Sequence, residues 1–565
     1  MGKRLNPARN IGLNDDPFVE RHVNESGTIV KKGKGLIKTA LVYPNTYKAG
    51  MSSLGFQTIY RLANQIDQVA CERVFLPDLK TRKQQTKTPR SLESGLSLDR
   101  FDVLLFSISF ENDFFHLIQL LEEAGIPLRS SDRNHTHPLV VAGGVACFLN
   151  PEPIAPFIDT FLLGEAELLL EPFFKTFFKN KKKPSFLSGL EKTIPGAYVP
   201  ALHLENALFE INVQYIKALD HITTASCILT SQTAFKDAFL IEILKGCPHG
   251  CRFCSAGFIY RPPRIYPAQN ILDAMDSAIS KTDRIGLVSS AIADHPQISR
   301  ICEYGQQKGF KLSFSSLRAD KLSENLIHSL SNAKVKTATI APEAGSERMR
   351  NIINKKIDEK DILSATQSLV RAGIINLRLY FMIGLPFEED DDVHAIVDLT
   401  KKIKSVFLEE SRKQKKMGTI TLSINPFIPK PATPFQWCGM APEMVIKKRI
   451  SIIRQGLKKT ANVNINIESL RKAKVDALLS RGDQKTADII ELALKDGWTS
   501  AMKQNKAYCQ NIIFSEKSID SPLPWDFLDN TIKKEFLIKE FHQAQQEKKS
   551  PSCPMIDCQL CQTCM

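Results

Sequence analysis

The stretch Lys245-Gly-Cys-Pro-His-Gly-Cys-Arg-Phe-Cys254 places Cys247, Cys251 and Cys254 in a Cys-x3-Cys-x2-Cys arrangement. Thiolates are soft ligands that select iron–sulfur clusters or zinc, and a closed structural site requires four of them. Three thiolates leave one metal position open for a substrate or a cofactor. Two plainer alternatives are a zinc knuckle completed by a distant fourth ligand, such as His249, and three unconnected core cysteines.

The composition is that of an ordinary globular protein. The chain has 565 residues, of which 43% are hydrophobic and 24% charged, and this length implies roughly two to four domains. The most apolar region, Pro138–Leu163, is broken by prolines and acidic residues, which argues against a membrane span. The first residues lack the apolar segment of a secretory signal, so we expect a cytoplasmic location.

Cysteines and lysines are distributed differently along the chain. Seven of the 13 cysteines lie in two tight clusters, a pattern that indicates metal binding rather than disulfides in a reducing compartment. The net charge of +14 is spread out, with local runs at Lys181–Lys183 and Lys401–Lys416. Such runs are usually solvated surfaces, and the alternative is contact with RNA or another polyanion.

Residues 36–180 alternate strand-like and helix-like patterns. Short branched apolar runs are typical of buried parallel strands, and longer periodic segments are typical of helices. The pattern predicts a doubly wound, Rossmann-like α/β domain, which binds ligands at the carboxyl ends of its strands. The expected strands are Ile37–Tyr43, Val103–Ile108, Leu139–Ala142 and Ile158–Leu163, the expected helices are Met51–Ile66 and Phe114–Ala124, and the strand ends carry Ser107, Ser109, Gly143 and Gly144.

Residues 238–440 change to repeated strand-then-helix units. Six such units predict a partial (β/α)6 barrel, whose sites gather at the carboxyl ends of the strands. The three cysteines directly follow the first strand, so the position of the motif agrees with its chemistry. The expected strands are Phe239–Leu244, Arg284–Ser289, Lys311–Ser315, Thr337–Ala341, Asn376–Met382 and Thr419–Ile424.

The cysteine loop, with Phe253 before the third cysteine, resembles the signature of the radical S-adenosylmethionine (SAM) superfamily. The resemblance implies a [4Fe-4S] cluster held by Cys247, Cys251 and Cys254, with SAM chelated by the open iron and its adenine near Phe253. An electron donor of the flavodoxin or ferredoxin type would drive cleavage of SAM to methionine and a 5′-deoxyadenosyl radical. His249 and Arg252 would tune the cluster potential.

Residues at later strand ends resemble the superfamily's SAM contacts. The usual Gly-Gly-Glu is replaced by Ser289-Ser290-Ala291, and the adenine-contacting segment lacks its first glycine. Arg318 is expected to pair with the SAM carboxylate and Glu343 with the ribose, whereas their plainer interpretations are a surface cation and a helix N-terminal charge. The candidate SAM-binding residues are Phe253, Ser289, Arg318, Glu343, Arg348, Gly384 and Glu388.

The first domain resembles the cobalamin-binding domain that precedes many radical SAM barrels. That domain carries Asp-x-His-x-x-Gly in its first loop, where this chain has Asn45, Tyr47 and Gly50. Ser107, Gly143-Gly144 and Gly164–Glu167 fit its other loops. Because tyrosine replaces the cobalt-ligating histidine, two alternatives stay open: cobalamin bound without a histidine ligand, and an empty or repurposed domain.

The remaining segments are an N-terminal extension (1–35), a connector (181–237), a C-terminal α/β region (441–550) and a Cys-rich tail (551–565). The tail offers four thiolates, which can saturate zinc or all four irons of a second cluster, and a flexible reactive tail is the alternative. The sequence does not choose between the metals. Over nearly its full length the chain is similar to bacterial cobalamin-domain radical SAM proteins whose substrate is not established. The tail cysteines are Cys553, Cys558, Cys561 and Cys564.

Three functional hypotheses remain. The first is a radical enzyme that modifies RNA or a ribosome-associated protein, for example by methyl or methylthio transfer, with weak support from the basic charge. The second is a radical enzyme acting on a small metabolite or lipid precursor, which a narrow neutral pocket at the barrel mouth would favour. The third is a non-catalytic iron–sulfur adaptor or redox sensor, in which a protein side chain fills the open iron position. The catalytic residues that act on the substrate are not identified by the sequence.

Overall fold

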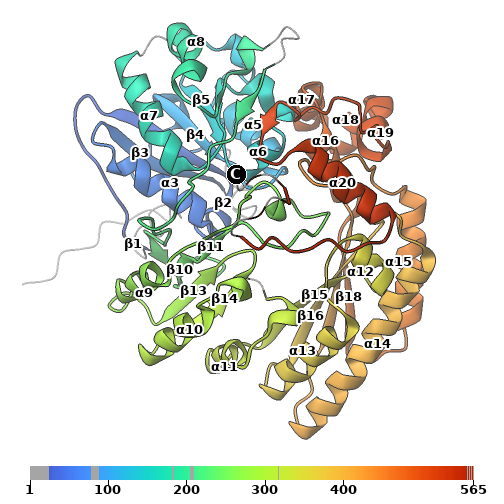
Figure 1. Ribbon diagram of the computed structural model, residues 1–565. Coiled ribbons are helices and arrows are strands. Elements are labelled where there is room, and N and C mark those ends of the chain that lie inside the picture. The colour runs from blue at the N-terminus through green and yellow to red at the C-terminus, as the bar shows by residue number, and fades with distance from the viewer. Residues whose placement is uncertain are drawn as a thin grey trace, which may run out of the picture.

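The structure is a computed structural model that describes residues 25–77, 88–180, 183–203, 209–315, 317–555, 558, 560–561 and 563. Figure 1 shows an α/β domain above two smaller lobes, each with its own strands, and a group of C-terminal helices beside them. Within those described ranges, no helix combines the length and the apolar character needed to cross a membrane.

The N-terminal domain is built on a six-stranded sheet of order β3-β2-β4-β5-β6-β7, parallel except for β7. This order is that of a doubly wound fold, with its topological switch point between β2 and β4. The predicted Rossmann-like architecture is confirmed. The strands are β2 (Ile37–Thr46), β3 (Val69–Leu76), β4 (Val103–Ser107), β5 (Leu139–Gly143), β6 (Thr160–Leu162) and β7 (Ala197–Tyr198), and the main helices are α3 (Leu54–Gln65), α5 (Asp113–Glu123), α7 (Ala166–Lys179) and α8 (Lys183–Thr193).

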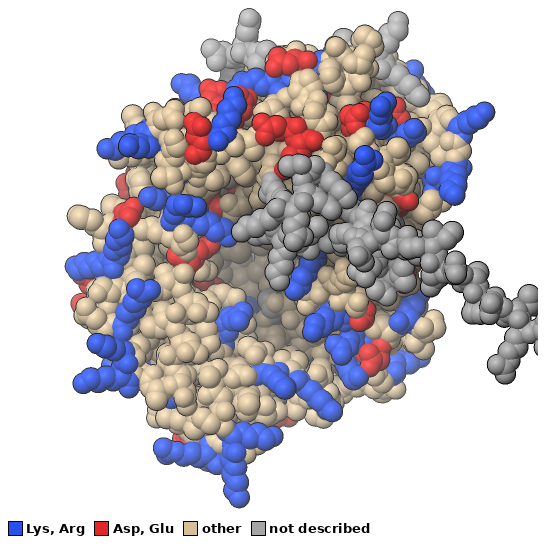
Figure 2. Space-filling view, turned by 180° about the vertical axis from the view of Figure 1, so that it is seen from behind, with Lys and Arg blue, Asp and Glu red and all other residues tan. Residues whose placement is uncertain are grey.

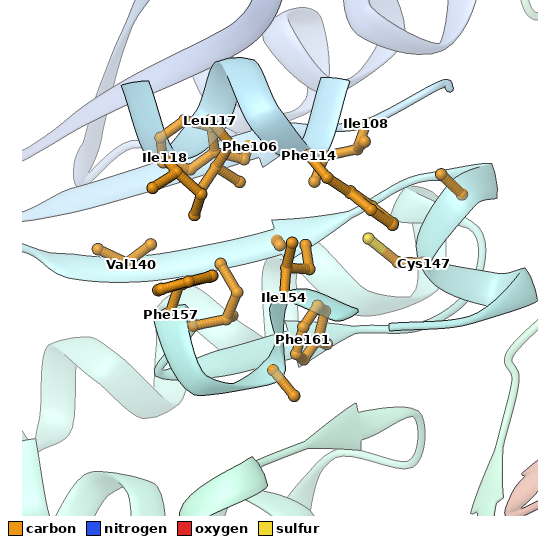
Figure 3. Close-up of a cluster of buried hydrophobic side chains, with 14 of the residues drawn as sticks. Phe106, Ile108, Phe114, Leu117, Ile118, Val140, Cys147, Ile154, Phe157 and Phe161 are labelled. Atoms are coloured by element: carbon orange, nitrogen blue, oxygen red, sulfur yellow. The ribbon is translucent and has the colours of Figure 1, made fainter. Parts of the chain in front are cut away.

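Both faces of this sheet are buried, as its continuous apolar strands require. Figure 3 shows one face, where Leu117 and Ile118 of α5 lie beside Phe106 and where Phe157 packs below Val140. The other face packs against α3 and α7 in a second apolar cluster. Full burial of side chains of this size stabilises by about 1.5–3 kcal/mol each, so the sheet is a rigid platform for its carboxyl-edge loops.

The predicted barrel strands form two parallel sheets rather than one continuous ladder. All six expected strands are present, and a seventh, β18, extends the second sheet beyond residue 440. Between the described residues of β14 and β15 no ladder is formed, so the barrel is open. The first sheet contains β10 (Phe239–Glu242), β13 (Arg284–Val288) and β14 (Lys311–Phe314), and the second contains β15 (Thr337–Glu343), β16 (Asn376–Ile383), β17 (Ile420–Pro426) and β18 (Val463–Ile467).

Helices cover the outer faces of both barrel sheets. The longest, α14 (Asp390–Lys413), begins with three aspartates, which interact favourably with the helix dipole, and has a capping box between Glu389 and Asp392. The other helices are α9 (Ala268–Asp276), α10 (Ile298–Gln307), α11 (Glu324–Asn332), α12 (Glu347–Ile352), α13 (Glu359–Arg371) and α15 (Glu443–Leu457).

The C-terminal region is mainly helical and returns to the N-terminal domain. Arg129 pairs with Asp488 and Glu491 of α17 at 2.5 and 2.8 Å. Lys430 on the barrel rim pairs with Glu111 of the N-terminal domain at 2.5 Å. The elements are α16 (Leu470–Arg481), α17 (Thr486–Asp496), α18 (Trp498–Gln504), α19 (Lys506–Phe514), β19 (Leu528–Asp529), which pairs with β8 (Ile211–Asn212), and α20 (Lys534–Gln545).

Candidate active site

The cysteine loop leaves the first barrel sheet through a tight turn. The strands β11 (Leu244–Lys245) and β12 (Arg264–Ile265) pair antiparallel and close the loop at its base. Gly246 has a φ of +80°, and a Cβ atom there would lie 2.6 Å from the carbonyl oxygen of Tyr260. Only glycine fits this turn without strain, which fixes the start of the loop next to Cys247.

The three thiols of the loop lie close together. Burial raises the pKa of Cys247 to about 12 and that of Cys254 to about 11, and the neighbouring Cys251 adds to both shifts. Cluster ligands are thiolates, so iron binding must displace these protons. In the described part of the chain, no three His, Cys, Asp or Glu side chains are arranged to hold a single metal ion. The donor set of three soft sulfurs on one loop nevertheless fits the ligands of a cluster with one open iron.

Cationic side chains surround Cys251. Burial lowers the pKa of Arg318, but Cys251 and other acidic neighbours raise it overall. Burial likewise opposes a rise in the pKa of Lys355, which Glu343 raises most and Cys251 next. Arg318 is held by Asp320, with its Nε 3.0 Å from Oδ1, and donates to the carbonyl of Lys355 at 2.9 Å. Lys355 in turn contacts Glu343 at 3.2 Å. The structure thus brings two predicted SAM-binding residues, Arg318 and Glu343, to the cysteine loop.

Sequence reasoning missed Lys355. It lies just after α12, between Asn354 and Lys356, which both have a positive φ of 53°. An Asn in the left-handed conformation at a helix end is a recognisable turn, but the sequence does not show that this turn faces the cysteines. Asn354 makes that contact directly, because its side-chain amide donates to the carbonyl of Gly250 at 3.0 Å.

Two further residues of the loop have polar partners. His249 Nε2 lies 2.8 Å from a carboxylate oxygen of Asp294, which follows the second barrel strand. Arg252 is fully buried, and its guanidinium donates to the carbonyls of Asn351 and Ile352 at 3.1 and 2.7 Å. These contacts fix the orientation of the loop from both sides.

The other predicted SAM-binding residues are placed differently. Arg348 pairs with Asp392 at 2.5 Å and with Glu547 at 2.8 Å. Glu388 accepts a hydrogen bond from the backbone of Gly384 at 2.6 Å and pairs with Arg449 at 2.7 Å. Phe253 packs against the apolar cluster that includes Met349 and Leu385, and Ser289 lies at the end of β13, where its backbone N–H donates to the Ser315 hydroxyl at 3.1 Å.

A cavity of about 630 Å³ lies between the N-terminal domain and the first barrel sheet. It extends to Lys245 and Gly246, directly before Cys247. Figure 2 shows the back of the molecule hollowed between the upper domain and the lower lobes. Small residues at strand ends line the cavity from both sides: Ser107, Ser109 and Gly144 from the N-terminal domain, and Ser289, Ser290 and Ser315 from the barrel.

The three residues of the cobalamin-like first loop pack or form hydrogen bonds within the N-terminal domain itself. Asn45 donates to Asp113 at 3.0 Å, and the buried Tyr47 hydroxyl is hydrogen-bonded to Glu25. A Cβ atom at Gly50 would lie 2.3 Å from the Phe75 ring. No histidine is among the described residues that line the cavity, so a histidine ligand to cobalt is not provided there. Gly143, by contrast, is close beside the cavity, at the end of β5.

Three of the four tail cysteines are described, and all three are buried: Cys553, Cys558 and Cys561. Cys564 lies outside the described residues. The backbone amide of Cys553 donates to the carbonyl of Pro248 at 2.8 Å, which places the tail against the cysteine loop.

Comparison with known proteins identifies the class. The family model for the N-terminal part of radical SAM proteins matches residues 55–200, and that for the radical SAM superfamily matches residues 241–400. An uncharacterized protein of Methanocaldococcus jannaschii, MJ0966, is 30% identical over 480 residues, which cover 84% of this chain and 95% of that protein.

Two more distant similarities involve characterised proteins. Ribosomal protein uS12 methylthiotransferase RimO of Thermodesulfovibrio yellowstonii is 23% identical over 211 residues, 34% of this chain and 48% of that protein. The structure of the radical SAM methyltransferase TsrM from Kitasatospora setae, with cobalamin and a [4Fe-4S] cluster bound, covers 82% of this chain and 100% of that chain, with 12% identity and a TM-score of 0.46. The two family matches and the full-length relative show that this chain belongs to the radical SAM superfamily and is an enzyme of that class.

Proposed function

We propose that the chain binds a [4Fe-4S] cluster through Cys247, Cys251 and Cys254, cleaves SAM reductively, and directs the resulting radical into the cavity beside the cysteine loop. The observation that carries this proposal is the extent of the cavity, which runs from the carboxyl edge of the N-terminal domain to Gly246. A molecule bound on that edge therefore lies next to the loop where the radical is generated.

The side chains near Cys251 suit the polar groups of SAM. Arg318 offers a planar, two-pronged donor to a carboxylate, and its contacts with Asp320 and Lys355 hold it in place. Glu343 is suited to accept from ribose hydroxyls, and Phe253 offers an aromatic face or edge to adenine. The electron required for cleavage would come from a flavodoxin- or ferredoxin-type protein, since radical SAM enzymes need an external reductant.

The cavity favours a small molecule as its occupant. Its volume of about 630 Å³ lies within the range of about 300–1,000 Å³ that is typical of small-molecule and cofactor sites. A small metabolite or lipid precursor fits such a space. Cobalamin bound without a protein histidine is the alternative occupant, because the serine and glycine edges of the N-terminal domain allow close approach of a ligand.

A macromolecular substrate is the second candidate function. The net charge of +14 and the partial similarity to a methylthiotransferase that acts on ribosomal protein uS12 favour RNA or a ribosome-associated protein. Figure 2, however, shows Lys and Arg side chains spread over the described part of one face rather than gathered in one patch. Membership of an enzyme superfamily argues against the third hypothesis, a non-catalytic adaptor.

The decisive experiment is anaerobic reconstitution with iron and sulfide, followed by dithionite, SAM and an assay for 5′-deoxyadenosine. We expect product from the wild type and from Cys302→Ala, which removes a buried thiol outside both cysteine clusters, but none from Cys251→Ala. Absence of product from a wild type that retains its cluster would contradict the proposal.

The occupant of the cavity can be tested with two tryptophan substitutions on α7. Ala166 lines the cavity, whereas Leu168 is 41% exposed on the same helix and does not line it. If cobalamin is the occupant, hydroxocobalamin should stay bound to the wild type and to Leu168→Trp during gel filtration and should be lost from Ala166→Trp. If the wild type retains no cobalamin, the occupant of the cavity is instead a substrate. Pools of small metabolites and of RNA should then be screened for products whose formation depends on SAM.

A further inference from the structure

The chain after α20 turns back toward the centre of the molecule and covers one side of the cysteine loop (Figure 1). The guanidinium of Arg252 donates to the carbonyl of Lys548 at 2.8 Å and to the hydroxyl of Ser550 at 2.9 Å. The backbone amide of Cys553 donates to the carbonyl of Pro248 at 2.8 Å. The loop therefore has a face that is covered by the tail, besides its start, which borders the large cavity.

A hollow of about 180 Å³, here called the tail hollow, lies between α20 and the tail. Three cations line it: Arg261, Lys539 and Lys549. Glu540 lines it too, but its carboxylate is paired with Arg252 at 3.1 Å. The tail hollow and the 630 Å³ cavity share no lining residue in the described part of the chain. Because Cys553 also lines the tail hollow, one hydrogen bond joins the wall of this hollow to the cysteine loop.

Positive charge exceeds negative charge around the tail hollow. Lys539 and the neighbouring Lys548 are exposed, and neither ammonium group is paired with a carboxylate of a described residue. Lys549 is also exposed, and its distance of 3.8 Å from the exposed Glu347 makes only a weak pair. Arg261 is 5% exposed and, among the described residues, has no carboxylate partner either. Such an excess of one charge attracts an oppositely charged partner and speeds its association.

Apolar side chains distinguish the kind of partner. Leu560, which is 43% exposed, and the half-buried Phe536 line the tail hollow together with the cations. An apolar anchor with charged groups around it is typical of protein–protein interfaces. Single-stranded RNA is instead held by aromatic rings that stack on its bases, and one face of the Phe536 ring is occupied by the guanidinium of Arg261, 5.2 Å away. The tail hollow therefore suits an acidic protein better than RNA.

The chemistry of the superfamily indicates which acidic protein is needed. Reductive cleavage of SAM takes one electron from an external reductant, and an electron passes between proteins only over a short distance. In the proposed function SAM and the occupant of the large cavity take up one side of the loop, so the reductant must approach from another. We infer that the tail hollow is the docking site of an acidic electron-carrier protein, guided there by Lys539, Lys548 and Lys549.

The inference rests on the proposed function, because the electron is used there to cleave SAM. The docking step moves one electron from the carrier to the cluster that the loop would hold. The carrier is oxidised by one electron, the cluster is reduced by one, and no bond forms or breaks at the tail hollow.

The test compares two reductants on the same anaerobically reconstituted protein. Dithionite is a small molecule that needs no docking site, whereas photoreduced flavodoxin is an acidic carrier protein. The test variant is the double charge reversal Lys539→Glu, Lys549→Glu, and Lys539→Arg, Lys549→Arg keeps both charges. The matched control is Lys401→Glu, Lys416→Glu, which reverses two exposed charges on and just after α14, a helix that runs away from α20 (Figure 1).

With dithionite, all four proteins should form 5′-deoxyadenosine at the same rate, because none of the substitutions touches the cysteine loop. With flavodoxin at low ionic strength, the test variant should lose about 10-fold in kcat/KM for flavodoxin. The control changes the net charge equally but leaves the tail hollow intact, so it should stay within about threefold of the wild type. High salt should lower the flavodoxin-driven rate of the wild type and leave the dithionite-driven rate unchanged, a measurement that needs no variant.

Fluorescence anisotropy of labelled flavodoxin measures docking without any catalysis. Equal flavodoxin affinities and rates in the test and control variants would overturn the inference, as would a wild type that binds neither flavodoxin nor plant-type ferredoxin. A test variant that loses affinity for RNA but not for flavodoxin would assign the tail hollow to nucleic acid instead. If no protein forms product with dithionite, the proposed function is contradicted, and the anisotropy measurement still decides whether an acidic carrier docks at the tail hollow.

Discussion

The backbone amide of Cys553 donates a hydrogen bond to the carbonyl of Pro248, 2.8 Å away, within the Cys247–Cys254 loop. The bond joins the C-terminal tail to the loop that defines the superfamily. Arg252, from the same loop, binds Glu540 of α20 and the carbonyl of Lys548. The active-site loop is therefore supported by the end of the chain as well as by the barrel.

The first prediction concerns this support. Arg252→Ala removes a fully buried guanidinium and leaves Glu540, itself 5% exposed, without its partner. Breaking a buried ion pair on one side costs about 3–5 kcal/mol, so the free energy of unfolding in urea should fall by about that amount. Iron should also be lost faster from the reconstituted variant.

A matched control for Arg252→Ala is Arg284→Ala. Arg284 is 51% exposed and 3.8 Å from Asp283, and such surface substitutions change stability by less than about 0.5 kcal/mol. Equal losses in the two variants would show that Arg252 does not support the loop. Arg252→Lys should give an intermediate loss, because one ammonium group cannot reach all the acceptors of the guanidinium.

The second prediction separates the two candidate cations for SAM. Arg318 lies near Cys251, whereas Arg348 is engaged with Asp392 and Glu547. A hydrogen bond to a charged group is worth about 1.5–3 kcal/mol, so Arg318→Ala should raise the Kd for SAM by about 10- to 150-fold. Arg348→Ala should change it by less than about twofold, because the Arg348 guanidinium is engaged by Asp392 and Glu547 rather than by SAM. Equilibrium dialysis of SAM against the reconstituted proteins measures both, and the reverse ranking would assign the carboxylate to Arg348.

Sequence reasoning predicted the parts of the fold that depend on local pattern. The runs of β4 and β5 are apolar without interruption because both faces of their sheet are buried, and they were predicted at nearly the observed bounds. β18 was missed because its residues alternate, Val463-Asn-Ile-Asn-Ile467, as in a half-buried edge strand with a weak apolar signal.

Contacts between distant segments were not predictable in this way. The Cys-x3-Cys-x2-Cys spacing located the cluster loop, and strand order placed Arg318 and Glu343 near it. Lys355 approaches the cysteines from the end of α12, and the tail reaches them from the end of the chain. Such contacts depend on tertiary packing. Periodicity and spacing describe only the local sequence, so they do not predict these contacts. The same limit applies to Arg348 and Glu388, whose partners Asp392 and Arg449 lie on other elements.

The third prediction tests the carboxyl edge of the N-terminal domain. Gly144 has a φ of +105°, and a Cβ atom there would lie 2.4 Å from the carbonyl oxygen of Ile108. Gly144→Ala should therefore cost at least about 1–3 kcal/mol of backbone strain, with a further cost for the clash. Thermal unfolding should show a lower Tm than Gly125→Ala, where φ is +69° and no atom lies within 4 Å of the added Cβ. An equal Tm for the two variants would mean that the loop at Gly144 accommodates the added Cβ atom without a loss of stability.

The last prediction concerns Asp113, at the start of α5. Burial raises its pKa from 3.8 to about 6, although hydrogen bonds from Asn45 and the Phe110 amide oppose this rise. The nearby Glu111 adds to the rise in pKa. The imidazole of His116 lies 3.9 Å from the Asp113 carboxyl group. The native state binds the Asp113 proton more tightly than the unfolded state does. The stabilisation that the protonated carboxyl group contributes is therefore complete below pH 4 and is lost as pH rises to about 6. The free energy of unfolding of the wild type, relative to that of Asp113→Asn, should therefore fall by about 1.4 kcal/mol per pH unit up to pH 6 and then stay level.

Urea titrations of both proteins between pH 5 and 7.5 measure this difference, and His116→Gln, made in both backgrounds, removes the neighbouring imidazole as a source of pH dependence. A difference that rises with pH across this window would mean that Asp113 is stabilised as the carboxylate, by Asn45 and the Phe110 amide, more than burial disfavours it.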